Sequence, residues 1–272
     1  MKIVTTTTMF ESTYPCERAI ERIAATGFDG IDMGFDRLEG YAESPMWGVG
    51  WREYAASLRE KADGCGIGFT HAHAPWNRFA ERFFERCVEA AHILGAGFIV
   101  VHPVESEADG TPVGSAEDFV RRNARIIYPR LEVAEKFGVV LLAENLHSRF
   151  SRDVRNVARL VEAVGSEHFG WCLDVGHMHI AGFSPETLGE CASAPRSLHL
   201  HDNFGKNDDH MIPGAGKIDF DALIAALRRV GYAGDCVLEA FSEVYNAKDG
   251  DRDPILRRLL AAGKSLRAKF ES

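Results

Sequence analysis

Short runs of apolar and β-branched residues alternate along the chain with longer segments of helical character. The short runs predict eight strands: Lys2–Thr7, Phe28–Met33, Ile67–Ala72, Phe98–His102, Val139–Glu144, Gly170–Asp174, Ser197–His201 and Cys236–Ala240. The longer segments predict helices at Glu17–Thr26, Glu53–Cys65, Phe79–Leu94, Ala116–Phe137, Asn156–Val164, Asp221–Val230 and Pro254–Ala268. In the fourth helix the apolar residues recur with a period near 3.6. Strict alternation of strands with helices predicts a parallel sheet covered by helices.

Glycines mark the joints between predicted helices and the strands that follow them, as at Gly27, Gly95 and Gly138. Glycine commonly ends a helix because it adopts the left-handed backbone conformation without a steric penalty. Eight strand–helix units in about 250 residues suit a closed (β/α)₈ barrel. Neither G-x-G-x-x-G nor G-x-x-x-x-G-K-[ST] follows the first strand, so no organic cofactor is expected. No Pro-, Gly- or Ser-rich linker divides the chain. We therefore predict an α/β fold, with residues 1–272 forming a single TIM barrel domain.

Composition bounds the class of protein and its partners. Hydrophobic residues make up 46% and charged residues 26%, as in an ordinary soluble globular protein. No apolar run approaches the ~18 residues of a membrane span, and the first ten residues lack the apolar core of a signal peptide. The six cysteines are scattered, which predicts reduced, buried thiols and a cytoplasmic location. The net charge of −9 does not favour a broad nucleic-acid surface, although a local basic patch is compatible with it.

Side chains able to bind a metal gather at the predicted strand ends. The third to eighth strands each end with one, in the order His73, His102, Glu144, Asp174, His199 and Glu239. Barrel enzymes build their sites at this carboxyl face. A single His there is more often a hydrogen-bonded structural residue, and a single acid often caps a helix. Asp202 and Asn203 are equally good turn residues. The convergence of six such side chains nevertheless indicates a functional site.

Four of these residues form an oxygen-rich set with one imidazole, namely Glu144, Asp174, His199 and Glu239. Carboxylate-dominated sites suit Mn²⁺ or Mg²⁺, and the imidazole also admits Zn²⁺ or Co²⁺. A divalent metal that holds two adjacent oxygens of a sugar acidifies the C–H between them. Because Glu144 and Glu239 come from strands on opposite sides of the site, they can exchange a proton with opposite faces of an enediolate.

Seven segments carry a resemblance to a known superfamily. They are HAHAPW, VVHP, LAENLH, CLDVGHMH, SLHLHDN, DDHMIPGAGKIDF and VLEAF, in that order. This series resembles the xylose-isomerase-like TIM barrels. That superfamily includes sugar-phosphate isomerases and epimerases, ketose 3-epimerases, inosose and dehydroshikimate dehydratases, and endonuclease-IV-type nucleases. The resemblance covers nearly the whole chain, and SLHLHDN followed by G-x-G-x-I-D-F is its most specific part.

The isomerase and epimerase branch of the resemblance implies one divalent metal on Glu144, Asp174, His199 and Glu239. It also implies that the two glutamates are the acid/base pair and that His177 contacts substrate hydroxyls. We add three substrate-binding candidates to His177, namely Lys206, Trp76 and Asn145. Trp76 offers an apolar face for a sugar ring, and Lys206 stands where some ketose epimerases have an Arg.

The nuclease branch implies three zinc ions instead of one. The first would be held by His73, His102 and Glu144, the second by the four-residue set, and the third by His177, Asp208 and His210. All nine positions carry the matching residue type. The acidic balance and the lack of Arg- or Lys-rich loops argue against a nucleic-acid substrate.

The leading hypothesis is a metal-dependent isomerase or epimerase of a sugar or sugar phosphate that works through an enediolate. The alternatives are a trinuclear zinc phosphodiesterase, a dehydratase of a cyclic polyol or keto acid, and a binding barrel without activity. We expect a small-molecule substrate and neither a nucleic-acid nor a membrane partner. The barrels that the chain resembles form homo-oligomers, so a dimer or tetramer is compatible with the hypothesis.

Overall fold

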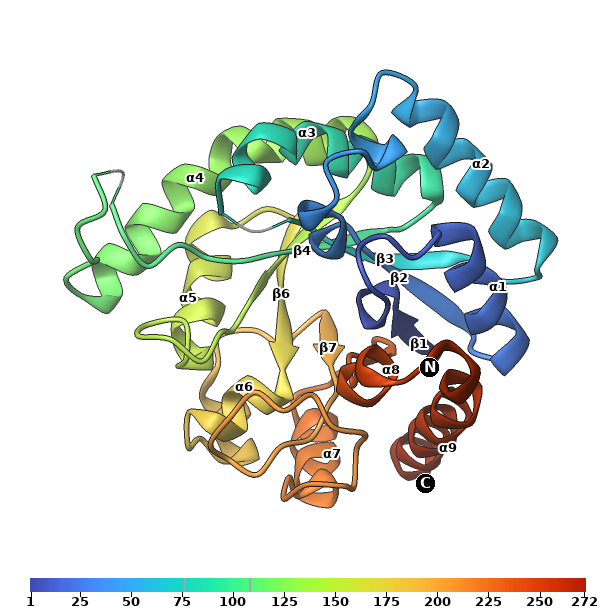
Figure 1. Cartoon of the computed structure of the whole chain (residues 1–272). Helices are drawn as coiled ribbons and strands as arrows, with labels where there is room; N and C mark the ends of the chain where they lie inside the picture. The colour runs from blue at the N-terminus through green and yellow to red at the C-terminus, as the bar shows by residue number, and fades with distance from the viewer. Residues whose placement is uncertain (76, 108) are drawn as a thin grey trace.

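The computed structural model describes residues 1–75, 77–107 and 109–272, and within these ranges eight parallel strands form one sheet (Figure 1). The strands are β1 (Ile3–Thr6), β2 (Gly30–Gly34), β3 (Phe69–His73), β4 (Phe98–Val101), β5 (Val140–Glu144), β6 (Phe169–Asp174), β7 (Ser197–His199) and β8 (Cys236–Leu238). Each strand from β1 to β7 lies beside the next in sequence, and β1 also pairs with β8.

Backbone contacts between β7 and β8 close the sheet into a barrel. The N–H of Leu200 donates to the carbonyl of Val237 at 2.8 Å, and the N–H of Glu239 donates to the carbonyl of Leu200 at 3.1 Å. Leu200 also forms an isolated parallel bridge with Leu238. The predicted (β/α)₈ TIM barrel is therefore confirmed.

Helices surround the barrel, as the alternating pattern predicts (Figure 1). They are α1 (Cys16–Thr26), α2 (Trp51–Gly64), α3 (Asn77–Leu94), α4 (Ala116–Phe137), α5 (Val154–Val164), α6 (Val175–Ile180), α7 (Phe220–Arg229), α8 (Ser242–Asn246) and α9 (Arg252–Glu271). The seven predicted helices are present, with small differences at their ends. The sequence analysis missed α6 and α8, because helices of six and five residues are too short to show helical periodicity.

Polar side chains gather at the carboxyl end of the barrel, although His71 of β3 and Ser197 of β7 are buried deeper in the sheet. The main core lies between the outside of the sheet and the helices, and a small second cluster of Val100, Leu142 and Cys172 is packed against Phe98 and Val140. This second cluster comes from the inward-facing positions of β4, β5 and β6. The same inward-facing series ends with the polar residues of the candidate site, because successive side chains of a strand alternate between its two faces.

The sequence predicts reduced, buried cysteines and no membrane-spanning segment. The described ranges contain all six cysteines, and none of them forms a disulfide. Four are buried as predicted, but Cys65 is exposed just after α2 and Cys191 is half-buried, so burial does not hold for those two. Within the described ranges, no helix combines the length and the apolar character needed to cross a bilayer.

Candidate active site

The four predicted metal ligands meet at the carboxyl end of the barrel. Glu144, Asp174 and His199 are the last residues of β5, β6 and β7, and Glu239 directly follows β8. One ligand atom from each lies within 4.8 Å of the ligand atoms of the other three. All four side chains are buried. The fold therefore brings three carboxylates and one imidazole together out of solvent.

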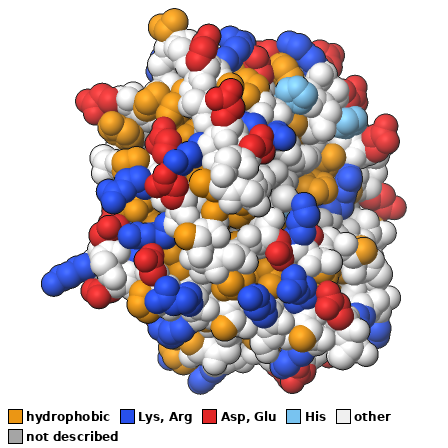
Figure 2. Space-filling model, turned by 90° about the vertical axis from the view of Figure 1, so that its right-hand side faces the viewer, with side chains coloured by type: hydrophobic (Ala, Val, Ile, Leu, Met, Phe, Trp, Pro, Cys, Tyr) orange, Lys and Arg blue, Asp and Glu red, His pale blue; other side chains and the backbone are white. Residues whose placement is uncertain are grey.

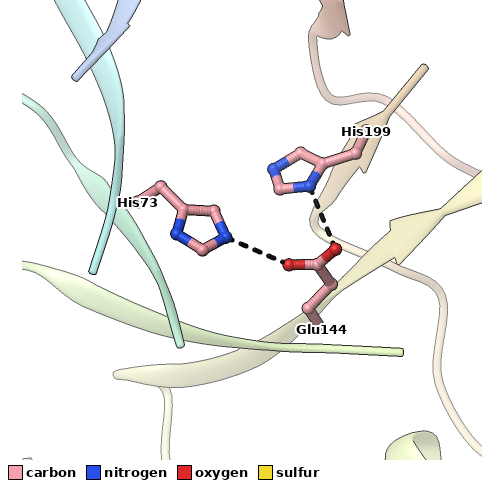
Figure 3. Close-up of side chains that lie close together, drawn as sticks. All are labelled: His73, Glu144 and His199. Atoms are coloured by element: carbon pink, nitrogen blue, oxygen red, sulfur yellow. Dashed lines mark hydrogen bonds and ion pairs between the residues drawn. The ribbon is translucent and has the colours of Figure 1, made fainter. Parts of the chain in front are cut away.

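His199 occupies the centre of this group, and Figure 3 shows its ring beside the carboxylate of Glu144. The Nδ1 atom of His199 lies 3.3 Å from Oε1 of Glu144 and 3.2 Å from Oε2 of Glu239. It is buried, yet it has no well-aligned hydrogen bond to any described residue. Burying several carboxylates together is costly unless a cation or donors compensate for their charge. A buried imidazole nitrogen without an aligned hydrogen bond, surrounded by carboxylate oxygens, therefore fits a divalent cation.

Two further imidazoles approach the other oxygen of Glu144. The Nε2 atoms of His73 and His102 lie 3.2 Å and 3.1 Å from Oε2 of Glu144 (Figure 3 shows His73). Burial opposes a charge on His73, but the hydrogen bond to Glu144 and the charge of Asp36 raise its pKa to about 10. Burial lowers the pKa of His102, and the charge of His73 lowers it further. His73 is thus the protonated member of this pair.

The negative charge of the two glutamates is also maintained by the site. Burial would raise the pKa of Glu144, but the charge of His199 and the hydrogen bond from His102 hold it well below its usual value. For Glu239, burial is likewise outweighed by the charge of His199, and the pKa falls to about 2. Both carboxylates are therefore ionised at neutral pH and able to accept a proton or bind a cation.

A second imidazole pair surrounds Asp208 at the edge of the site. The Nε2 atoms of His177 and His210 lie 3.1 Å and 2.9 Å from Oδ2 of Asp208. The Nδ1 atom of His210 lies 2.9 Å from the backbone oxygen of Glu239. His210 has a φ of +43°, a left-handed conformation that costs free energy in a residue other than glycine. All nine residues named by the nuclease-type resemblance are thus brought together at one end of the barrel.

Three predicted substrate-binding residues lie elsewhere or outside the described ranges. The amide of Asn145 is paired with the backbone of Asp174, accepting at 2.8 Å and donating at 2.9 Å. It joins the ends of β5 and β6 and does not line the cavity. Lys206 is exposed and does not line the cavity either. Trp76 lies outside the residues that the structure describes.

The cavity above the carboxylates has a volume of about 270 Å³ and contains residues that the sequence analysis missed. Its described lining is Thr8, Asp36, His73, His102, Glu144, His177, Asp208, His210, Glu239 and Phe241. Asp36 accepts a hydrogen bond from the hydroxyl of Thr8 at 3.1 Å, and burial raises the pKa of its carboxyl. Asp36 lies two residues after the end of β2 at Gly34, whereas the predicted strand ends at Met33. A search for ionisable residues just beyond the true strand end would have found it.

His201 is a further buried residue of the site. Its Nε2 lies 3.1 Å from Oδ1 of Asp174, and its ring stacks on that of His210 with centroids 4.0 Å apart. A Cβ on Gly176 would lie 1.9 Å from the ring of His201, so a larger residue is excluded there. The glycine in the segment CLDVGHMH therefore makes room for the histidine of SLHLHDN.

Asp202 anchors the loop that carries Asp208 and His210. Its carboxylate accepts four backbone hydrogen bonds, from Asn203, Gly214, Gly216 and Ile218. A Cβ on Gly216 would lie 2.4 Å from Oδ1 of Asp202, which explains one glycine of the G-x-G-x-I-D-F segment. The turn-residue interpretation of Asp202 is the one that the structure shows.

Comparison with known proteins gives matches to one family. A family model described as xylose isomerase-like TIM barrel matches residues 20–265. The D-psicose 3-epimerase of Agrobacterium fabrum is 25% identical over 243 residues, covering 82% of this chain and 78% of that protein. The inosose isomerase of Bacillus velezensis is 26% identical over 171 residues, 60% of each chain. The chain spans little more than half the length of some curated relatives that it matches.

The overall fold is also shared with solved structures. The IOLI protein with a bound zinc atom superposes with a TM-score of 0.81 at 19% identity, and the match covers 99% of both chains. At 19% identity this likeness shows that the two chains share a fold.

Proposed function

The chain belongs to the xylose isomerase-like TIM barrel family, and on this premise we propose that it is a divalent-metal-dependent isomerase or epimerase of a sugar, with residues 1–272 working as one barrel domain. The reaction would move a proton on a sugar or sugar phosphate through an enediolate. The observation that carries the proposal is the pair of buried, ionised glutamates, Glu144 and Glu239, whose oxygens flank Nδ1 of His199. The relatives named above are sugar isomerases and epimerases, which supports the same class of reaction.

The metal would be held by Glu144, Asp174, His199 and Glu239, whose donor atoms already converge. Their oxygen-rich chemistry suits Mn²⁺, Mg²⁺, Co²⁺ or Zn²⁺. When bound, such a cation polarises a carbonyl or hydroxyl oxygen of the substrate and makes the adjacent C–H more acidic. The backbone of Asp174 is held by the amide of Asn145, so this ligand is oriented before any metal binds.

The glutamates would move the proton, and the imidazoles would orient the sugar. Glu144 is the last residue of β5, and Glu239 directly follows β8. Each carboxylate can therefore take a proton from, or return it to, its own face of the substrate. His177 lines the cavity, and its Nδ1 lies 2.9 Å from the backbone oxygen of Asn145. This contact fixes the ring, so that Nε2 faces Asp208 and the cavity and is placed to bond a substrate hydroxyl.

The described lining of the cavity favours an uncharged sugar over a phosphorylated one. It includes four carboxylates, those of Asp36, Glu144, Asp208 and Glu239, but neither Lys nor Arg. The cations of the described lining are imidazoles and the proposed metal, and it lacks the Arg or Lys side chains that usually bind a phosphate group. Sugar hydroxyls, in contrast, find both acceptors and donors in this lining.

A trinuclear phosphodiesterase is the second candidate. It is favoured by the two imidazole pairs, because His73 with His102 and His177 with His210 each converge on one carboxylate oxygen. The surface on the side of α1, α2 and α9 does not add support for a nucleic-acid substrate. Figure 2 shows Lys and Arg side chains interspersed there with Asp and Glu. Arg22 of α1, for example, forms an ion pair with Asp249 at 2.6 Å.

The test is deuterium incorporation from solvent. Metal-loaded protein is incubated in D₂O with a panel of ketohexoses and inososes, and the recovered sugar is examined by NMR. We expect exchange at the carbon next to the carbonyl, and a loss of about 10²–10⁴-fold in Glu239→Gln because an acid/base group is removed. Glu243→Gln, two residues beyond the barrel lining on α8 and paired with Arg258 at 2.8 Å, is the matched control and should retain full exchange.

Other outcomes identify the alternatives. Cleavage of bis(p-nitrophenyl) phosphate or of an abasic duplex, without exchange into any sugar, would replace the proposal by the phosphodiesterase. A product with new ultraviolet absorbance and loss of water would replace it by the dehydratase. Full exchange in Glu239→Gln would refute the role given to this glutamate.

A further inference from the structure

We propose that the protein has a second subsite beside the catalytic cavity, which holds a second ring joined to the sugar that reacts. The substrate would then be a two-ring glycoside. The subsite is a side pocket of about 230 Å³ lined by Thr8, Phe10, Ser12, Arg37, Phe241 and Tyr245. The inference rests on the proposed function for the identity of the first ring.

The side pocket adjoins the catalytic cavity, because Thr8 and Phe241 line both. Phe241 follows Glu239 by two residues, and its ring stacks on His210 with centroids 4.0 Å apart. Thr8 donates its hydroxyl hydrogen to Asp36, which lines only the catalytic cavity of the two. A two-ring ligand would therefore place one ring on each side of Thr8 and Phe241.

The volumes indicate that the two spaces serve one ligand. The catalytic cavity has about 270 Å³ and the side pocket about 230 Å³. Each is smaller than the ~300 Å³ at which typical ligand sites begin, whereas together they fall within that range. A single sugar ring would leave the side pocket filled only with water.

The lining of the side pocket has the mixed chemistry that a sugar ring needs. Phe10, Phe241 and Tyr245 supply aromatic faces, and the ring of Tyr245 is 48% exposed. Such rings offer large, rigid apolar surfaces for the C–H face of a sugar. The hydroxyl of Ser12 lies at the same pocket for hydrogen bonds to the ring substituents, whereas that of Thr8 already donates to Asp36 and accepts from Thr6.

Arg37 forms a fixed wall of this lining. Its side chain is buried and held by hydrogen bonds from Nη1 to the carbonyl of Glu11 at 3.0 Å and from Nη2 to the carbonyl of Tyr14 at 3.1 Å and to Sγ of Cys16 at 2.9 Å. Its Nε has no hydrogen-bond partner among the described residues but is itself buried, so it offers no donor to a ligand in the pocket.

The same contacts argue against a phosphate group in the side pocket. Phosphate and carboxylate groups usually engage arginine through two parallel N–H donors. In Arg37, Nη1 donates to the carbonyl of Glu11, and Nη2 donates to the carbonyl of Tyr14 and to Sγ of Cys16. Both hydrogens of Nη2 are thereby engaged, and each parallel pair of guanidinium donors includes one of them, so neither pair is free for an anion. A neutral sugar ring matches this aromatic lining better than an anion does.

The experiment compares equilibrium binding of one-ring and two-ring ketoses to metal-loaded protein by calorimetry. The probes are D-fructose and three disaccharides that carry a second ring on a fructose unit at O3, O4 or O6: turanose, lactulose and isomaltulose. D-Fructose 6-phosphate is the anionic probe. We expect at least one disaccharide to bind tenfold or more tightly than D-fructose, and this gain to fall below threefold in Tyr245→Ala. Tyr128→Ala, which removes a tyrosine of similar exposure on α4, should retain the gain.

The proposal is overturned if every disaccharide gains less than tenfold, if a gain of threefold or more survives Tyr245→Ala, or if only the phosphate ester shows the gain. Binding is measured without turnover, so this result is separate from the deuterium exchange test. A Tyr245-dependent gain without exchange in any sugar would leave the subsite standing and remove the proposed function. Exchange in D-fructose without any gain for disaccharides would do the reverse.

Discussion

The loop that joins β7 to α7 is held by one buried carboxylate, and removing that carboxylate should destabilise the whole protein. In Asp202, Oδ1 accepts from the backbone N–H of Asn203 at 2.9 Å and of Ile218 at 3.1 Å. Oδ2 accepts from Gly214 at 2.9 Å and from Gly216 at 2.8 Å. Asp202→Ala removes both acceptor oxygens and with them all four hydrogen bonds.

The size of the effect follows from the number and exposure of these bonds. A hydrogen bond to a charged group contributes about 1.5–3 kcal/mol, and less where water replaces the lost partner. Gly214 is exposed and Gly216 is half-buried, so water replaces part of the loss, whereas Asn203 is buried. We expect Asp202→Ala to lower the free energy of unfolding by about 3–6 kcal/mol, a large part of the ~5–15 kcal/mol of a typical domain.

Urea unfolding followed by circular dichroism measures this loss directly. The control is Asp209→Ala on the same loop, because the carboxylate of Asp209 accepts one long backbone hydrogen bond, from Phe204 at 3.4 Å. The control should lose less than about 1 kcal/mol. If Asp202→Ala lost no more than the control, the four hydrogen bonds would not hold the loop as described.

Three further predictions concern the site itself. Elemental analysis should find about one metal per chain for a mononuclear sugar enzyme. This metal should be lost in Asp174→Asn and kept in Asp208→Ala. About three zinc ions, one of them lost in Asp208→Ala, would instead support the phosphodiesterase. Asp36→Asn should reduce kcat/KM by about 10–100-fold through a higher KM, because a half-buried, charged acceptor for a substrate hydroxyl becomes a neutral amide. Steady-state kinetics on the sugar identified by deuterium exchange check this, and unchanged KM would contradict it. Burial raises the pKa of Asp32 to about 6, above the ~3.9 of an unfolded chain, so the folded state binds the extra proton between these values and loses stability as the pH rises through about 6. Metal-free Asp32→Asn should therefore melt at a higher temperature than the wild type at pH 8, with a smaller difference at pH 5; the same difference at both pH values would show that Asp32 does not titrate in this way.

The fold was predictable because each unit of the chain repeats the same local pattern. Apolar runs that start after Gly27, Gly66 or Gly138 and lead into helices recur along the whole sequence. A strand buried on both faces reads as a continuous apolar run, and a helix that covers it shows its own period. The short helices α6 and α8 have too few residues to display such a period, and only the coordinates reveal them.

The metal-ligand candidates were also predictable, since parallel strands of a barrel deliver their carboxyl ends to one face. Glu144 and Asp174 end their predicted strands, and His199 lies two residues before the end of its own, so they could be grouped without knowing a single distance. Only the structure shows that the seventh strand ends at His199. The pairings within the group needed coordinates, as in the approach of His73 and His102 to one oxygen of Glu144.

By itself, then, the sequence determined which strands contribute to the site and which residue types they bring. Only the tertiary structure decided where side chains just beyond the strands point. It turns the amide of Asn145 to the backbone of Asp174, leaves Lys206 in solvent, and brings Asp36 and Phe241 into the cavity. The physical reason is that alternation fixes the direction of a side chain within a strand. Beyond the last residue of a strand, the direction of a side chain depends on backbone angles and on contacts with distant residues, which the spacing of residues in the sequence does not reveal.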